Sequence, residues 1–298
     1  MAGPSLLQCR GWHGFQRQIP GAGGKIAGDW PIWMFFRIFV SWIFNSMHRM
    51  IRKVFYLLSL VAMCLGTGVL AEAQDWGGLQ RFAAANAALA EPVDGQPRVV
   101  LMGDSITEEW LRLRPDFFSS NGYVGRGISG QVSAQMLVRF RQDVIDLHPA
   151  AVVINAGTND VAENQGPYDE DFTLGNIISM VELSRANGIA VVLTSVLPAA
   201  RFSWRPALTD AADKIAALNV RIRAYAQEQG IPYVDYYTPM VVSDPSRALN
   251  SAYSNDGVHP VPAGYEVMEP LVKDAIATAL ENRSVASDDD GCCYCCCR

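Results

Sequence analysis

From residue 75 onward, short apolar segments alternate with longer amphipathic ones, and this alternation constrains the fold more than any other feature. Five apolar segments have the character of buried strands, and they begin at residues 98, 123, 151, 190 and 232. Segments with helical spacing cover residues 76–89, 131–147, 171–186, 209–229 and 262–280. Strands that alternate with helices form right-handed βαβ units. The sequence therefore predicts an α/β fold, a three-layer α/β/α sandwich around a mostly parallel five-stranded sheet, formed by one domain over residues 74–283.

Residues 1–73 do not resemble a folded domain. A basic start at Met50, an apolar stretch over 54–70 and the sequence Ala71-Glu72-Ala73 are the three parts of a secretory signal peptide. Cleavage after Ala73 would make the protein secreted or periplasmic, and it would meet the membrane only during export. An uncleaved membrane anchor is the alternative. Residues 1–49 lie upstream of this signal, and we interpret them as an over-extended start or an unstructured extension.

The seven cysteines lie towards the two ends of the chain, and none occurs from residue 65 to residue 291. The predicted domain therefore contains no internal disulfide. No histidine or carboxylate lies among the five cysteines of residues 292–297, and a polar run precedes them. We therefore expect residues 284–298 to be a disordered tail rather than a metal site. The net charge of −6 argues against nucleic acid as a partner, because phosphate contacts need a basic surface.

Four polar blocks follow the predicted strands or lie in late loops, and the first is Gly103-Asp104-Ser105-Ile106-Thr107. Here a strand runs through a tight turn into a helix. A serine in such a turn exposes its hydroxyl at the edge of the sheet, and its N–H lies at a helix N-terminus that favours negative charge. Ser105 is therefore the candidate nucleophile. A simple helix N-cap is the alternative role for this serine.

A serine nucleophile needs a base, and only two histidines follow the expected cleavage site. His148 ends a helix and resembles a C-terminal cap. His259 follows Asp256 by three residues in Asp-Gly-Val-His-Pro. This spacing lets the carboxylate accept from Nδ1 of the imidazole and leaves Nε2 to take the serine proton. We expect Ser105, His259 and Asp256 to act together, with a purely structural His–Asp pair as the alternative.

The two remaining blocks can supply hydrogen-bond donors for the oxyanion that forms during acyl transfer. Gly130 in Gly-Ile-Ser-Gly can turn its N–H into the site, and Asn159 in Gly-Thr-Asn-Asp can offer its side-chain amide. Together with the N–H of Ser105 they would form a three-donor oxyanion hole. Taken singly, Gly130 could be a plain turn residue and Asn159 a helix cap.

The four blocks, in this order, resemble the SGNH hydrolases, also called the GDSL family, over roughly residues 97–281. The chain resembles the branch that includes platelet-activating-factor acetylhydrolase-like and carbohydrate esterases. The resemblance implies a flavodoxin-like fold, hydrolysis of carboxylic esters through an acyl-enzyme, and neither a metal nor a cofactor. It assigns the nucleophile to Ser105, the base to His259 and its orientation to Asp256. It also assigns the oxyanion hole to Ser105, Gly130 and Asn159.

The chain departs from the family pattern at two places. Gly125-Arg126-Gly127 stands where many members have Asn-Arg-Gly, and Val261 stands where many have a polar residue after His-Pro. The first departure leaves the local backbone of that block open, and it does not affect Gly130.

Two other functions remain open at this stage. Residues 125–130 fit the dinucleotide-binding pattern G-x-G-x-x-G, but the next strand ends in Ile154-Asn155-Ala156, without the acidic residue that the pattern requires. A non-catalytic binding module with the same fold is the second alternative. An α/β-hydrolase is excluded, because the predicted mature chain contains no G-x-S-x-G motif.

The loop over residues 197–206 leaves the fourth strand at the edge where the site is expected, and it interleaves arginines with aromatic residues. Aromatic faces stack on sugar rings, and guanidinium groups donate to hydroxyl and carboxylate oxygens. The candidate substrate-binding residues are Asp104, Trp110, Phe202, Trp204 and Arg205. Since no apolar lid segment is evident, we expect acetyl and other short acyl esters of carbohydrates or similar polar alcohols. Longer acyl chains, as in a lysophospholipase or thioesterase, are the alternative, and the sequence does not indicate an oligomeric state.

Overall fold

The computed structural model describes residues 32–66, 75–93 and 95–291. The chain divides into two units, Met1–Glu72 and Ala73–Arg298. The division lies one residue before the domain boundary expected at residue 74.

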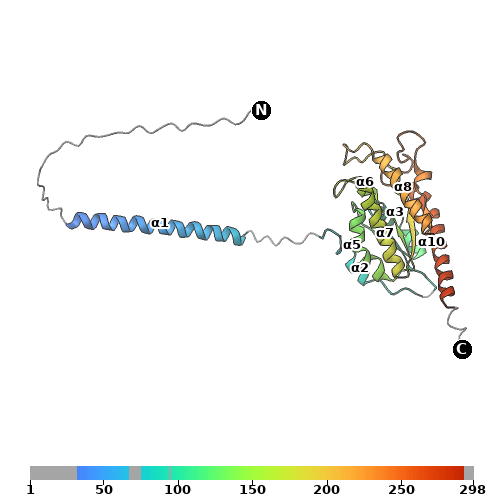
Figure 1. Cartoon of the computed structure of the whole chain (residues 1–298), viewed down its shortest axis with the longest axis horizontal. Helices are drawn as coiled ribbons and strands as arrows, with labels where there is room; N and C mark the ends of the chain where they lie inside the picture. The colour runs from blue at the N-terminus through green and yellow to red at the C-terminus, as the bar shows by residue number, and fades with distance from the viewer. Residues whose placement is uncertain (1–31, 67–74, 94, 292–298) are drawn as a thin grey trace, which may run out of the picture. The chain divides into compact units, whose positions relative to one another are not determined.

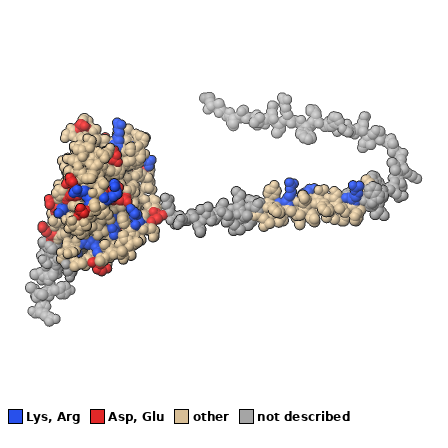
Figure 2. All heavy atoms as spheres, turned by 180° about the vertical axis from the view of Figure 1, so that it is seen from behind, with Lys and Arg blue, Asp and Glu red and all other residues tan. Residues whose placement is uncertain are grey.

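The described part of the first unit is the helix α1 (Ile32–Gly66). This helix passes through Met50 without a break, so it contains both the end of the upstream segment and the first part of the expected signal peptide. The rest of that signal, residues 67–73, lies outside the described residues. The charged residues of α1 are all Arg or Lys (Figure 2). Among the described helices, α1 included, none is both long and apolar enough to span a membrane.

The second unit is built on one five-stranded sheet with the order β2-β1-β3-β4-β5. The strands are β1 (Val99–Gly103), β2 (Tyr123–Gly127), β3 (Ala151–Ile154), β4 (Ala190–Thr194) and β5 (Tyr233–Val234). Every pair of neighbouring strands is parallel. The α/β prediction with its five strands is therefore confirmed. All carboxyl ends of the strands lie at the same edge, where ligands bind in sheets of this kind.

Helices cover both faces of the sheet (Figure 1). Those that belong to the second unit are α2 (Ala83–Ala87), α3 (Ser105–Leu113), α4 (Pro115–Asn121), α5 (Ser133–Asp143), the 3-10 turn η1 (Ile145–Leu147), α6 (Thr158–Val161), α7 (Glu170–Ala186), α8 (Ala211–Glu228), α9 (Tyr237–Met240) and α10 (Pro262–Gly291). The cluster of apolar side chains from α5, α7 and α8 packs on one face of the sheet. A second cluster from α3, α4 and α10 packs on the other.

The alternation of side chains along β1 explains why both faces are covered. Val100 and Met102 belong to the cluster with α5, α7 and α8, whereas Val99 and Leu101 belong to the opposite cluster. All four are buried, and each such side chain contributes roughly 1.5–3 kcal/mol relative to an exposed position. A strand that is apolar at every position is therefore stable only between two layers of helices.

Two helix predictions are wrong in extent. The helix expected over residues 76–89 is reduced to α2, because both carboxylate oxygens of Asp75 accept from backbone N–H groups, those of Leu79 and Gln80 at 2.7 Å each, and hold a turn there. The last helix continues to Gly291 instead of ending at residue 280, so residues 284–291 are helical and not disordered. No glycine or proline interrupts the sequence between Leu271 and Asp290. The cysteine-rich residues 292–298 lie outside the described residues.

Candidate active site

The turn between β1 and α3 places Ser105 at the carboxyl edge of the sheet. Asp104 caps the helix, and its Oδ1 accepts from the N–H of Ile106 at 2.9 Å. Glycine is required at the ends of the paired strands β1 and β2. A Cβ at Gly103 would lie 2.1 Å from Oγ1 of Thr107, and one at Gly127 would lie 2.2 Å from the backbone nitrogen at position 108. These two glycines let the first turn of α3 pack against the strand ends, which holds Ser105 at the edge.

Ser105, His259 and Asp256 form one continuous hydrogen-bonded path. Oγ of Ser105 lies 2.9 Å from Nε2 of His259, and Nδ1 of the same imidazole lies 2.7 Å from Oδ2 of Asp256. Oδ1 of Asp256 accepts from the backbone N–H groups of Val258 and His259 at 2.9 and 2.8 Å. The structure therefore brings together the three residues that the sequence singled out, in the order that proton transfer needs.

The surroundings of Asp256 keep it ionised. Burial alone would raise the pKa of this carboxyl group, but the hydrogen bonds from His259 and Val258 outweigh it and lower the pKa to about 2. Asp256 is therefore a carboxylate at neutral pH. As a carboxylate it accepts from Nδ1–H and leaves Nε2 free to accept the proton of Ser105.

We expect Asp256→Asn to lower kcat by up to about 10⁴-fold, because the imidazole loses control of its tautomer. The geometry of the loop should survive, since an amide oxygen can still accept the two backbone hydrogen bonds. The measurement is kcat for 4-nitrophenyl acetate beside the thermal unfolding midpoint. Unchanged kcat would show that the His–Asp pair is structural.

Gly130 and Asn159, the two further candidates for the oxyanion hole, follow the carboxyl ends of β2 and β3. Gly130 has a φ of +77°, a left-handed conformation that favours glycine. Asn159 lies in α6, which follows β3, and is only 3% exposed. Its Nδ2 donates to Oδ2 of Asp104 at 3.2 Å and to the carbonyl oxygen of Gln131 at 3.1 Å. An oxyanion bound by this amide would therefore share its hydrogens with acceptors of the protein.

The blocks that carry Gly130 and Asn159 are fixed to each other by Asp160. Its carboxylate accepts from the backbone N–H of Ser133 at 2.9 Å and from the Ser133 hydroxyl at 2.5 Å. Burial raises the pKa of Asp160, against the effect of these hydrogen bonds. The start of α5 and the helix α6 consequently keep one relative position.

The profile of the GDSL-like lipase/acylhydrolase family matches residues 101–267, more than half of the chain. The chain belongs to this family. As a family member it is a hydrolase that acts on carboxylic ester bonds.

Solved structures of similar sequence agree with this assignment. A GDSL-like lipase from Bacteroides thetaiotaomicron VPI-5482 is 60% identical and matches 68% of this chain and 99% of its own, with a TM-score of 0.67. A protein of Bacteroides fragilis NCTC 9343 with a provisional acylhydrolase name is also 60% identical and matches 70% of this chain and 99% of its own, with a TM-score of 0.68. An uncharacterized lipoprotein of Bacillus subtilis, YqeF, is 23% identical over 217 residues, which are 60% of this chain and 89% of that protein.

The glycine pattern of residues 125–130 has a packing role in this GDSL-family hydrolase. A Cβ at Gly125 would lie 3.1 Å from the side chain of Leu111, and one at Gly127 would overlap the backbone of α3. Two of the three glycines of the dinucleotide-like pattern are thus explained by close contact between β2 and α3.

Two of the candidate substrate-binding residues lie in the protein core, and those predictions are wrong. Trp110 is 3% exposed and stacks between Phe117 and Tyr265, with ring centroids 5.1 and 5.4 Å away. It therefore fixes α3 against α4 and α10 and forms no wall of the site. Phe202 is fully buried in the apolar core, so its ring is not available to a sugar.

Asp104 also has a different role from the expected substrate contact. It is fully buried, and its two carboxylate oxygens accept from Ile106 N and Asn159 Nδ2. Burial raises the pKa of Asp104 to about 6, although the N–H of Ile106 and the nearby His259 oppose the change. From within the core, Asp104 holds the first turn of α3 and the side-chain amide of Asn159.

Trp204 and Arg205 remain on the surface. Trp204 is 41% exposed, and its ring centroid lies 6.3 Å from that of His259. The buried Phe202 supports it from below at 5.2 Å. Nη2 of Arg205 donates to the backbone oxygen of Glu163 at 2.9 Å. The exposed indole therefore lies beside the base, on the rim of the site.

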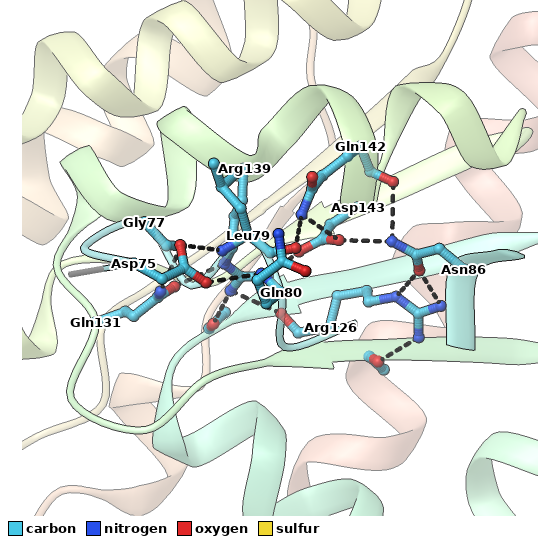
Figure 3. A network of polar contacts seen from close by, with 12 residues as sticks. Asp75, Gly77, Leu79, Gln80, Asn86, Arg126, Gln131, Arg139, Gln142 and Asp143 are labelled. Atoms are coloured by element: carbon cyan, nitrogen blue, oxygen red, sulfur yellow. Dashed lines mark hydrogen bonds and ion pairs between the residues drawn. The ribbon is translucent and has the colours of Figure 1, made fainter. Parts of the chain in front are cut away.

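A buried arginine network, which the sequence did not reveal, supports the strand ends (Figure 3). The guanidinium of Arg139 is fully buried, and its Nη2 donates to the carbonyl oxygens of Gly103 and Arg126 at 3.0 and 2.9 Å. Nε donates to Oε1 of Gln131 at 2.6 Å, and Nη1 pairs with Asp143 at 3.0 Å. Arg139 thus connects the end of β1, which leads into Ser105, with the loop that carries Gly130. Among the described residues, no cluster of three or more His, Cys, Asp or Glu side chains is arranged to hold a metal ion.

Proposed function

We propose that this protein is a serine esterase in which Ser105 is the nucleophile, His259 the general base and Asp256 the group that orients it. The observation that supports this most strongly is the hydrogen-bonded path from Oγ of Ser105 through the imidazole to the carboxylate. Ser105, at one end of this path, follows β1 at the carboxyl edge of the sheet, and the amide of Asn159 donates to the preceding residue, Asp104.

In the proposed reaction, Oγ of Ser105 attacks the ester carbonyl carbon and its proton moves to Nε2 of His259. The N–H groups of Ser105 and Gly130 and the amide of Asn159 stabilise the oxyanion. When the tetrahedral intermediate collapses, His259 gives its proton to the leaving alcohol. A water molecule then attacks the acyl-enzyme by the same sequence of proton transfers, which releases the acid and restores Ser105.

For the substrate, we propose short acyl esters, acetyl above all, of a carbohydrate or similarly polar alcohol. The support is the exposed indole of Trp204 beside His259, which offers a flat apolar face to a sugar ring next to the reacting bond. Arg205 lies on the same rim and can donate to substrate hydroxyl groups with N–H groups that Glu163 leaves free. Longer acyl chains, as in lysophospholipids or thioesters, are the alternative.

We expect kcat/KM to fall as the acyl chain lengthens from acetyl to butyryl, octanoyl and palmitoyl esters of one alcohol. A long chain would need an apolar surface that contributes roughly 0.8 kcal/mol per buried CH₂ group. Trp204→Ala should lower kcat/KM for an acetylated sugar and leave 4-nitrophenyl acetate less affected. A steady rise in rate towards octanoyl esters, or indifference of the sugar ester to Trp204→Ala, would contradict this substrate class and favour a lipase or thioesterase.

We further propose that the protein is exported. The support is the order of basic, apolar and Ala-x-Ala segments over residues 50–73, together with a relative that is named a lipoprotein. We expect the mature protein to begin at Gln74 after expression in a bacterium. N-terminal sequencing of the purified product tests this, and a cytosolic product that retains Met50 would contradict it.

A further inference from the structure

The turn after α6 presents Asn164 to three parts of the active site. Its Oδ1 accepts from Nε1 of Trp204 at 2.9 Å. Its Nδ2 donates to Oδ1 of Asn159 at 2.6 Å and lies 3.5 Å from the carbonyl oxygen of Gly130. Nδ2 of Asn159 in turn donates to Asp104, the residue before Ser105. One chain of hydrogen bonds therefore runs from the exposed indole to the residue beside the nucleophile.

The backbone of this turn is held in an unusual conformation. Glu163 has a φ of +57°, and the N–H of the following residue, Asn164, donates to the carbonyl oxygen of Asn159 at 3.1 Å. This is the pattern of a helix end at which glycine is the preferred left-handed residue. Contacts from Arg205 to the backbone oxygen of Glu163 and from Lys214 to its carboxylate hold the turn in place. Non-glycine residues in this conformation concentrate at functional sites, where the surrounding structure imposes them.

Because the hydrogen bonds from Trp204 to Asp104 all point the same way, they strengthen the amide of Asn159 as a donor. Every donor points from Trp204 towards Asp104, and bonds aligned in this way polarise one another. Asn159 accepts on its carbonyl oxygen, which makes its own N–H groups stronger donors. Asn159 is almost fully buried, so loss of this partner would leave its carbonyl oxygen unpaired, and only the bonds to Asp104 and Gln131 would then hold its amide.

We propose that Asn164 is a positioning residue that couples Trp204 to the oxyanion-binding amide of Asn159. The proposal rests on the function proposed above, in which Asn159 stabilises the oxyanion and Trp204 holds the alcohol part of the substrate. The side chain of Asn164 then fixes the position of Trp204, which contacts the alcohol, and the orientation of the Asn159 amide, which donates to the carbonyl oxygen of the substrate. A ligand on Trp204 would thereby stabilise the orientation of the amide, so the identity of the alcohol would influence kcat as well as KM.

Kinetics on the full-length protein test the proposal. We expect Asn164→Ala to lower kcat for 4-nitrophenyl acetate about tenfold to hundredfold, somewhat less than complete loss of one oxyanion donor. KM should stay within about twofold of the wild-type value, and affinity for a boronic acid that forms a tetrahedral adduct should fall in step with kcat. Gln165→Ala is the matched control, because Gln165 belongs to the same turn but contacts Trp76 instead. It should leave kcat unchanged.

A second variant and a spectroscopic measurement keep the result interpretable if Asn164→Ala folds poorly. Trp204→Phe keeps an aromatic ring but removes the indole donor, and we expect kcat to fall about twofold. In both variants the side-chain amide resonances of Asn159 should move upfield in the ¹H–¹⁵N spectrum, and in Gln165→Ala they should not. Wild-type kcat and unshifted Asn159 resonances in the Asn164 and Trp204 variants would overturn the coupling. Absence of ester hydrolysis by the wild-type protein would instead refute the proposed function, while the Asn159 resonances would still test the coupling.

Discussion

Ser105→Ala is expected to reduce ester hydrolysis about 10⁴- to 10⁶-fold, which is the typical effect of removing a catalytic residue that acts as part of a unit. The hydroxyl group that this substitution removes is the group that lies 2.9 Å from Nε2 of His259. No other hydroxyl group can replace it at the start of α3, because Thr107 lies beside Gly103 and not at the imidazole. The remaining rate should come from substrate binding and the oxyanion donors alone.

The fold should survive this substitution. The cap of α3 depends on the carboxylate of Asp104 and not on the serine hydroxyl. Ser179→Ala is a suitable control, because the Ser179 hydroxyl bonds to Gly175 within its own helix and should leave activity unchanged. Turnover of 4-nitrophenyl acetate and the site of labelling by a fluorophosphonate should both be measured. Label on a residue other than Ser105, or wild-type turnover in Ser105→Ala, would contradict the assignment.

The fold could be predicted from the sequence because its signals are local. Apolar runs at β1 and β3 can be buried only between two layers, and the helical spacing of the segments between strands supplies those layers. The polar blocks that follow the strands must then meet at one edge. The sequence also brought His259 and Asp256 to Ser105, although 154 residues separate the serine from the histidine, because a serine nucleophile needs a base and only two histidines follow residue 73.

The direction of single side chains was harder to predict. Trp110 follows Ser105 by five residues, which turns a helix by about 500° and points it roughly 140° away from the serine. That rotation directs Trp110 into the core, and helix geometry could have revealed it. Phe202 lies in an irregular loop without a period, and its burial in the core depends on tertiary packing that no local pattern encodes.

The supporting residues of the site gave no sequence signal at all. Arg139 is a buried arginine in the middle of an amphipathic helix, and such a residue looks like an exposed charge until the strand ends that it joins are in place. Asn164 lies in a turn, and two of its three partners, Gly130 and Trp204, come from loops that are distant in the sequence. Ser105, Gly130 and Asn159 follow strand ends, and His259 and Asp256 are marked by their spacing, whereas the residues that orient them depend on tertiary contacts.

His259→Ala is expected to reduce kcat nearly as much as Ser105→Ala, about 10⁴-fold or more. The imidazole is the only basic group in hydrogen-bonding contact with Oγ of Ser105 among the described residues. Without it the proton of the serine has no acceptor during attack, and the leaving alcohol has no donor. Asp256 cannot take over, since it accepts from the far nitrogen of the ring and its lowered pKa of about 2 makes it a weak base.

The second histidine of the folded unit provides a matched control. His148 lies at the end of η1 on the protein surface, where its Nδ1 is 3.5 Å from a carboxylate oxygen of Glu91. We expect His148→Ala to leave kcat and KM within about twofold of wild type, because surface substitutions away from a site have small effects. Both variants should be assayed with 4-nitrophenyl acetate across pH 5–9, with circular dichroism to verify the fold. An essential His148 and a dispensable His259 would show that the base has been assigned to the wrong residue, and the hydrogen bond to Ser105 would then be structural.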